Sequence, residues 1–251
     1  MNSVTIALIA FACVAGGAMI GLFLNAVLPS QHLSGDAKDT VKLGMGLIGT
    51  MTAILLGLLI ASAKSSYDTQ NDELTEMSAK VILLDRILAH YGPETKETRD
   101  LLRGAVSRVL EAVWPQGHPE NSGAAASPGG AEILYEKIQG LSPQSEAQRL
   151  TQNQALSVVI DLAKIRWLMF QQGMNSVSPP LLVVLVFWLA LIFCSFGLLG
   201  SRTPIVVATL SLCALSVSAA IFLVVDMHSP LSGVVQISSA PLRAALAHLG
   251  K

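Results

Sequence analysis

The chain has 251 residues, of which 52% are hydrophobic and 13% charged, and its formal net charge is -1. A charged fraction this far below the ~25% typical of soluble domains excludes an ordinary soluble globular protein. The lack of a basic surplus also argues against a nucleic-acid partner.

The apolar residues are gathered into four charge-free runs, over 4–28, 43–63, 180–201 and 204–225. Each run is long enough to cross a bilayer core of ~30 Å at a helical rise of ~1.5 Å per residue. Backbone amides in lipid must be satisfied within the segment, which requires helices. No Lys or Arg precedes Lys38, so the first run lacks the positive region of a signal peptide and is expected to remain as a span. The pattern predicts an all-α protein that crosses a membrane four times.

These runs divide the chain into four parts. Residues 1–63 hold spans one and two, and 64–179 form a helical soluble domain inserted between spans two and three. Residues 180–226 form a hairpin of spans three and four, and 227–251 form a C-terminal tail. An even number of spans places both termini and the 64–179 domain on one side of the membrane, which we predict to be cytoplasmic.

The second span is predicted to continue beyond the membrane as one helix of about 50 residues, roughly 75 Å long. No proline interrupts 43–92, and the apolar residues after Lys64 repeat at spacings of three and four. This heptad-like seam favours helix packing, either within one copy of the chain or between copies in an oligomer. The seam consists of Leu74, Met77, Val81, Leu84, Leu88 and Tyr91. Gly92 and Pro93 then predict the end of the helix.

Further soluble helices are expected over about 94–114, 131–139 and 143–172, and the composition of 115–130 is typical of a loop. In the tail, Ser239 and Pro241 predict the start of a short helix. One face of that helix carries Leu242, Leu246 and Leu249. We expect it either to lie on the membrane surface or to pack against the soluble helices.

One face of the second span carries a stripe of small side chains with a lysine at each end. The stripe consists of Gly46, Thr50, Ala53, Gly57 and Ala61, and the lysines are Lys42 and Lys64. Small residues let neighbouring helices approach closely, and lysines at span ends reach the interface. Alternatively, the stripe lines an axial pathway in an oligomer, where the lysines form positive rings that favour anions. Asp36 and Asp39 would cancel part of the field near the first lysine.

The fourth span has a second set of small residues, which we interpret as a surface for tight helix packing. They are Thr209, Cys213, Ser216 and Ala220. Asp226 follows this span. An ionisable group at membrane depth indicates function, but at the end of a span we expect Asp226 to be a solvated boundary residue.

The sequence contains no arrangement typical of an enzyme. Its five histidines are scattered without a carboxylate or cysteine at ligand spacing, and its three cysteines all lie in apolar runs. Residues 44–49 match the letters of the G-x-G-x-x-G motif, but they lie inside a predicted span, where no nucleotide would bind. We therefore predict no enzymatic activity, no cofactor and no metal site.

Several long stretches resemble a bacterial membrane family of undefined function that is labelled bestrophin-like. They include HLSGDAKDTVKLGMGLIGTMTAILLGLLIASAKSSYDTQ (32–70), LLDRILAHYGPETKETRDLLR (83–103), YEKIQGLSP (135–143), FWLALIFCSFGLLG (187–200) and VDMHSPLSGVVQISSAPLRAAL (225–246). The resemblance covers most of the chain and implies a location in the bacterial inner membrane.

The topology is also similar to that of the bestrophins, which are pentameric anion channels whose second spans line the pore. Two features differ from the bestrophins. Residues 43–63 have neither Phe nor Pro, whereas the second spans of bestrophins have bulky residues and a proline. The acidic calcium clasp of animal bestrophins has no counterpart in this sequence. The resemblance implies a homo-oligomer, with a pentamer favoured, that conducts inorganic anions along the second span. The alternative is a non-conducting scaffold or regulatory protein whose cytoplasmic helices bind a partner.

Overall fold

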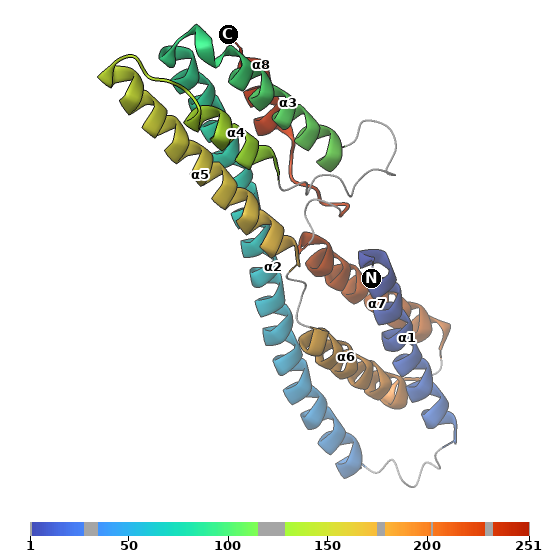
Figure 1. Cartoon of the computed structure of the whole chain (residues 1–251). Helices are drawn as coiled ribbons and strands as arrows, with labels where there is room; N and C mark the ends of the chain where they lie inside the picture. Colours follow the sequence, from blue (N-terminus) through green and yellow to red (C-terminus); the bar gives the residue numbers. More distant parts are fainter. Residues whose placement is uncertain are drawn as a thin grey trace. The chain divides into compact units, whose positions relative to one another are not determined.

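The computed structural model describes residues 2–27, 35–114, 129–174, 179–201, 203–228 and 233–250, and these ranges contain helices and no strand. In chain order the helices are α1 (Ser3–Val27), α2 (Gly35–Tyr91), η2 (Pro93–Thr95, a 3-10 turn), α3 (Lys96–Val113), α4 (Gly129–Gln139), α5 (Glu146–Met174), α6 (Pro179–Leu199), α7 (Pro204–Met227) and α8 (Ala240–His248) (Figure 1). The all-α prediction is confirmed.

Four of the helices are long and apolar enough to cross a membrane, and they contain the four predicted runs to within a residue or two. They are Ser3–Val27, Lys38–Tyr91, Pro179–Leu199 and Pro204–Met227. The second of them continues past the predicted span as one helix, as expected. Most of the predicted loop at 115–130 lies outside the described residues.

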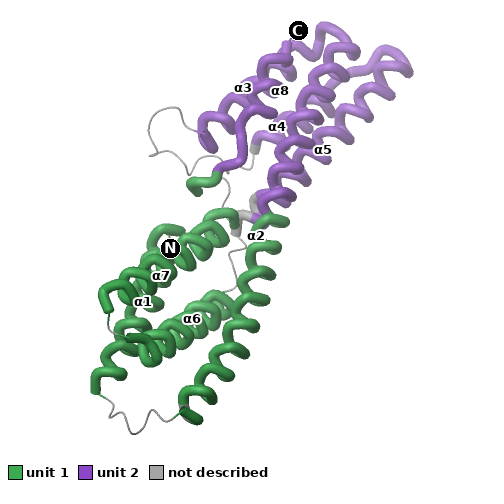
Figure 2. The backbone as a smooth tube through the Cα atoms, turned by 180° about the vertical axis from the view of Figure 1, so that it is seen from behind, with its two compact units in different colours: residues 1–66, 176–235 green, residues 67–175, 236–251 purple. Residues whose placement is uncertain are grey.

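The chain forms two compact units, drawn in different colours in Figure 2. Unit 1 combines residues 1–66 and 176–235, and unit 2 combines residues 67–175 and 236–251. The boundary between them falls inside α2. Unit 1 therefore holds α1, α6, α7 and the first half of α2, while unit 2 holds the second half of α2 with the soluble helices and the C-terminal segment.

In unit 1, α1 packs along α6 and also contacts α7. Their shared core includes Val14, Leu185 and Ile221, each at most 1% exposed. The α1–α6 crossing is close because it is built on glycines. A Cβ at Gly21 would collide with the Cys194 carbonyl oxygen, and one at Gly197 would collide with the backbone oxygen of Ala18 on α1. Small residues permit this separation between helices.

The end of the α1–α6 pair is held by an amide side chain. Asn25 Nδ2 donates to the carbonyl oxygens of Leu198 and Gly200, at 2.8 Å in both cases. These carbonyls belong to the last turn of α6 and the residue after it, where no helical N–H is available to them. A single side chain thus satisfies two acceptors and links the two helix ends.

Unit 2 is built around the second half of α2, and the predicted seam is buried there. Leu74, Val81, Leu84, Leu88 and Tyr91 are each at most 5% exposed, and Met77 is partly buried against the same cluster. Val81, Leu84 and Leu88 of the seam share one core cluster with residues of α3, α4, α5 and α8. The prediction that this seam mediates helix packing is confirmed within the protomer.

The end of α2 follows the predicted signal. Gly92 has φ of 142°, a conformation that side chains other than glycine rarely adopt, and Pro93 starts the next turn. The buried hydroxyl of Thr95 donates to the Leu88 carbonyl oxygen at 2.6 Å. That carbonyl is among the last four of α2, which have no partner within the helix. The turn is therefore satisfied internally.

The C-terminal segment belongs to unit 2. On α8 and directly after it, Leu242, Ala245 and Leu249 are buried in the same cluster as the α2 seam, and Leu246 is partly buried against it. Trp114 Nε1 donates to the Ile237 carbonyl oxygen at 3.0 Å, which holds the approach to α8. Of the two placements expected for this helix, packing against the soluble helices is the one observed.

Candidate pore-lining face of helix α2

Within unit 1, the membrane half of α2 turns one side toward the protomer core. Thr52 and Leu59 are each 5% exposed and Ala63 is 0% exposed. Leu55 and Leu56 pack partly against the same cluster. At 3.6 residues per turn these positions share one face. The remaining circumference of α2 is left uncovered by the described residues of the protomer.

The small-residue stripe and its two lysines lie on the uncovered side. Gly46, Thr50, Ala53, Gly57, Ala61, Lys42 and Lys64 are all exposed. A Cβ added at Gly46 or Gly57 would meet nothing within 4 Å. The stripe therefore does not serve helix packing within the described part of the protomer, and its role lies in contact with lipid, with water or with another chain.

A third face of the same helix has large apolar side chains. Its most exposed members are Leu43 (77%), Leu47 (66%), Ile54 (68%) and Leu58 (62%). At 100° per residue this face directly borders the small-residue stripe and is further from the core face. Most of the exposed surface of α2 is thus divided between two chemistries, one large and apolar, the other small with a hydroxyl and terminal charges. Ile60, which is 46% exposed, is a large side chain on the stripe side.

The polar groups of the stripe have nearby partners. Lys42 Nζ lies 2.9 Å from Asp39 Oδ1, and both side chains are well exposed. The Asp39 carboxylate therefore neutralises part of the charge of Lys42, as predicted for the acids at the start of this helix. The Thr50 hydroxyl donates to the Gly46 carbonyl oxygen at 2.9 Å, so its oxygen lone pairs remain available as acceptors.

The small residues of the fourth span do not pack as expected. On α7, Thr209, Cys213 and Ser216 are exposed and Ala220 is half-buried, whereas Ala214, Ser218 and Ile221 on the other side of the helix are buried. Within the described residues of the protomer the stripe does not make the predicted tight contact, and packing against another copy stays a prediction. The close helix crossing in unit 1 is instead made by α1 and α6, at glycines of those two helices. The spacing of small residues on α7 gives no information about them.

Asp226 is also placed differently from the expectation. It is 1% exposed, and its Oδ2 accepts a hydrogen bond from the Val235 N–H at 2.7 Å. A Cβ at Gly233 would lie 2.7 Å from the other carboxylate oxygen. Asp226 is thus a buried acceptor that fixes the chain beyond α7, rather than a solvated boundary residue.

Unit 2 contains a buried ion pair that sequence reasoning missed. The Asp85 carboxylate on α2 accepts hydrogen bonds from Arg99 Nε at 2.7 Å and from Arg99 Nη2 at 2.9 Å. Its Oδ2 also accepts a hydrogen bond from the Gly250 N–H at 3.3 Å. Burial acts to raise the pKa of Asp85, but the hydrogen bonds from Arg99 and Gly250 and the positive charges nearby hold it below its ordinary value. The two residues are fourteen positions apart, so periodicity could not pair them.

The missed α1–α6 crossing did leave a signal. Gly17 and Gly21 form a G-x-x-x-G pair in the first span, a motif typical of close helix approach in membranes.

Within the described residues no group of three or more His, Cys, Asp or Glu could hold a metal ion.

The fold defines a helical membrane protein in which four of the described helices are long and apolar enough to cross the membrane, together with a second helical unit. The sequence model of the Bestrophin-like domain matches residues 12–242, and the chain belongs to this family. No curated protein sequence matches it.

Solved structures share the fold. Two crystal structures of a bacterial bestrophin homologue from Klebsiella pneumoniae, each with one substitution, match with TM-scores of 0.64 and 0.65. Their sequence identities are 11% and 10%, and the alignments cover 94% and 98% of this chain and 97% and 99% of the homologue. A crystal structure described as that of a membrane protein matches with a TM-score of 0.63 at 12% identity, over 96% of each chain.

Proposed function

We propose that this protein is a homo-oligomeric channel of the bacterial inner membrane that conducts inorganic anions along the small-residue stripe of α2. In this proposal α2 of each copy faces a common axis, residues 64–179 and both termini are cytoplasmic, and the oligomer is a pentamer like the bestrophins that the sequence resembles. Lys42 and Lys64 then form a positive ring at each mouth of the path.

The observation that carries the proposal is the uncovered stripe. Its residues from Lys42 to Lys64 are exposed over about six turns of helix, while the core face of α2 is packed. Small side chains leave room for water and ions along an axis. The large apolar face with Leu47, Ile54 and Leu58 is suited to lipid or to the spans of a neighbouring copy.

A flux measurement on purified protein in liposomes tests the path. We expect Thr50→Leu and Ala53→Phe to lower chloride flux about tenfold, because a ring of bulky apolar side chains adds a dehydrated barrier of ~1.4 kcal/mol or more. Ile54→Phe is the matched control, since Ile54 is the next residue, is 68% exposed and lies on the large apolar face. Flux that is equal in wild type and in both stripe variants would contradict the proposed path.

A charge series tests the mouth of the path. Asp39 lies 2.9 Å from Lys42, so Asp39→Asn should uncover the lysine charge and raise the preference for anions over cations. Lys42→Glu should lower that preference. Both effects should shrink at high ionic strength, because exposed charges are screened within ~10 Å at 0.1 M salt. Reversal potentials in lipid bilayers measure the ratio of anion to cation permeability. Shifts of this ratio in the same direction in both variants would be inconsistent with a positive ring.

A scaffold function is the second candidate, and exposed apolar side chains on unit 2 favour it. Leu150, Ile160 and Trp167 on α5 are each more than half exposed, and Ile133 on α4 is 49% exposed. Such side chains suit a partner or another copy of the chain. A symmetric ring with hydrated stripes supports the channel, whereas a monomer or two-fold dimer with the stripes packed shut supports the scaffold.

A further inference from the structure

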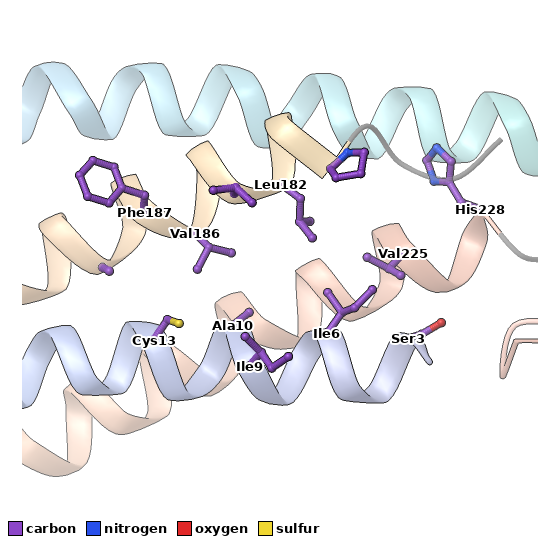
Figure 3. Close-up of a pocket in the computed structure, with 13 residues that line it drawn as sticks. Ser3, Ile6, Ile9, Ala10, Cys13, Leu182, Val186, Phe187, Val225 and His228 are labelled. Carbon is purple, nitrogen blue, oxygen red and sulfur yellow. The ribbon is translucent and has the colours of Figure 1, made fainter. Parts of the chain in front are cut away.

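Unit 1 has an apolar groove whose lining residues do not include the small-residue stripe of α2. It has a volume of about 700 Å³ and lies between α1, α6 and α7 (Figure 3). This volume is within the ~300–1,000 Å³ range of ligand sites in proteins. Its walls are apolar side chains such as Ile6, Ile9, Leu182 and Val186. The three helices are long and apolar enough to span a membrane, so acyl chains of the bilayer can reach the open side of the groove.

The groove has one polar end. Ser3 and His228 line it there, while Cys13 and Phe187 line the opposite end (Figure 3). Ser3 is 9% exposed and brings a hydroxyl to this end of the groove. His228 Nδ1 lies 2.9 Å from the Val224 carbonyl oxygen, so Nδ1 carries the proton and Nε2 remains for a ligand. The first N–H groups of α1, at Ser3, also lack helical acceptors and favour an anion.

The depth of the groove corresponds to one leaflet. Ser3 and Cys13 are ten residues apart on α1, or ~15 Å at 1.5 Å per residue, which is about half of the ~30 Å hydrocarbon core. Beyond Cys13, α1 and α6 close on each other, since a Cβ at Gly17 would meet the Ala190 carbonyl oxygen. A helix from another copy would run the full thickness of the membrane, whereas an acyl chain from one leaflet ends where this groove ends.

We propose that the groove binds one acyl chain of an anionic membrane phospholipid, with its phosphate group at the Ser3 and His228 end. The apolar walls contact the chain, and the Ser3 hydroxyl and the first N–H groups of α1 provide donors to the phosphate. Nε2 of His228 accepts a hydrogen bond from a headgroup hydroxyl. This site is independent of the proposed conduction path on α2, so loss of the lipid site and loss of ion flux are separate results.

Native mass spectrometry of the full-length protein with added phosphatidylglycerol tests the site. We expect one retained phospholipid per protomer in wild type and about tenfold less in Ile9→Trp, whose side chain would occupy the groove. Leu8→Trp is the matched control, because Leu8 is 62% exposed on the same helix and does not line the groove. His228→Ala should reduce the preference for phosphatidylglycerol over phosphatidylcholine. Equal retention in the two tryptophan variants would overturn the proposal, as would retention of oleate in preference to phosphatidylglycerol.

Cysteine labelling gives a second readout that does not depend on those variants. In a protein whose only cysteine is Cys13, phosphatidylglycerol should slow maleimide labelling. In one whose only cysteine is Cys213, which is exposed and outside the groove, it should not. Protection of Cys13 that follows assembly of the protein without added lipid would show that a second copy covers the groove and would overturn the proposal.

Discussion

Gly21→Leu is expected to prevent unit 1 from reaching its native packing. A Cβ at this position would overlap the backbone carbonyl of Cys194 on α6, and the next atoms within reach are also backbone. Overpacking against mobile side chains costs ~1–3 kcal/mol, but a helix backbone cannot move aside without separating α1 from α6. We therefore expect the free energy of unfolding to fall by more than ~4 kcal/mol, which is at the extreme end for single substitutions. The readout is a lost or broadened monodisperse peak in detergent.

Gly16→Leu provides the matched control for this variant. Gly16 is in the same helix, but a Cβ there meets nothing within 4 Å. Replacing a helical glycine by leucine also removes a propensity penalty of up to ~1 kcal/mol. The Gly16→Leu protein should therefore elute and unfold like wild type, or at slightly higher temperature. If the two leucine variants behaved alike, close α1–α6 contact would not be the cause.

Asp85→Asn is expected to lower the free energy of unfolding by about 3 kcal/mol. The Asp85 side chain is 2% exposed and its partner Arg99 is 22% exposed, so the substitution leaves a largely desolvated guanidinium without its counter-charge. It also weakens the acceptor for the Gly250 N–H, which follows α8. Thermal unfolding in detergent, followed by a signal from the soluble helices, measures the loss.

An exposed pair in the same unit provides the comparison. Lys137 Nζ lies 2.6 Å from Glu97 Oε1, a distance as short as in the buried pair, but the side chains are 45% and 71% exposed. Pairs of this kind contribute ~0–1 kcal/mol, so Glu97→Gln should change stability little. A similar loss in Glu97→Gln and Asp85→Asn would show that burial does not set the strength of the Asp85 pair.

The Asp85 pair also predicts a pH dependence. Since the pKa of Asp85 in the folded protein is below its ordinary value, the carboxylate stabilises the fold above pH ~4. This contribution is lost as the pH falls through the folded pKa. The stability difference between wild type and Asp85→Asn should therefore be full at pH 7 and narrow below pH ~4. A difference that stayed constant into acid would contradict the shift.

Much of the fold could be predicted because its signals are local. The four spans follow from length and the absence of charge, and the seam from Leu74 to Tyr91 follows from spacing, because helical periodicity places those side chains on one face. The same periodicity placed the small residues of α2 and their lysines on one face. Whether that face was covered by the rest of the protomer did not follow, because coverage depends on where the other helices pack.

Non-local contacts account for the errors and omissions. Asp226 was expected to be solvated because it ends a span, but the return of the chain at Val235 supplies a backbone N–H donor. The stripe on α7 was expected to pack, but α1 and α6 make the close crossing. Asp85 and Arg99 meet across the turn at Gly92, and no local pattern distinguishes them from exposed residues of the same types.

The sequence alone determined that this protein is an all-α membrane protein with four spans, a soluble helical insertion and a long second helix, since these depend on the length, periodicity and solvation of each segment. Only the tertiary structure decided that the α2 stripe is left uncovered, that glycines bring α1 against α6, and that an apolar groove with one polar end opens beside them. Those features depend on which faces of distant segments pack together. The free energy of that packing depends on side-chain fit and desolvation that no single segment encodes.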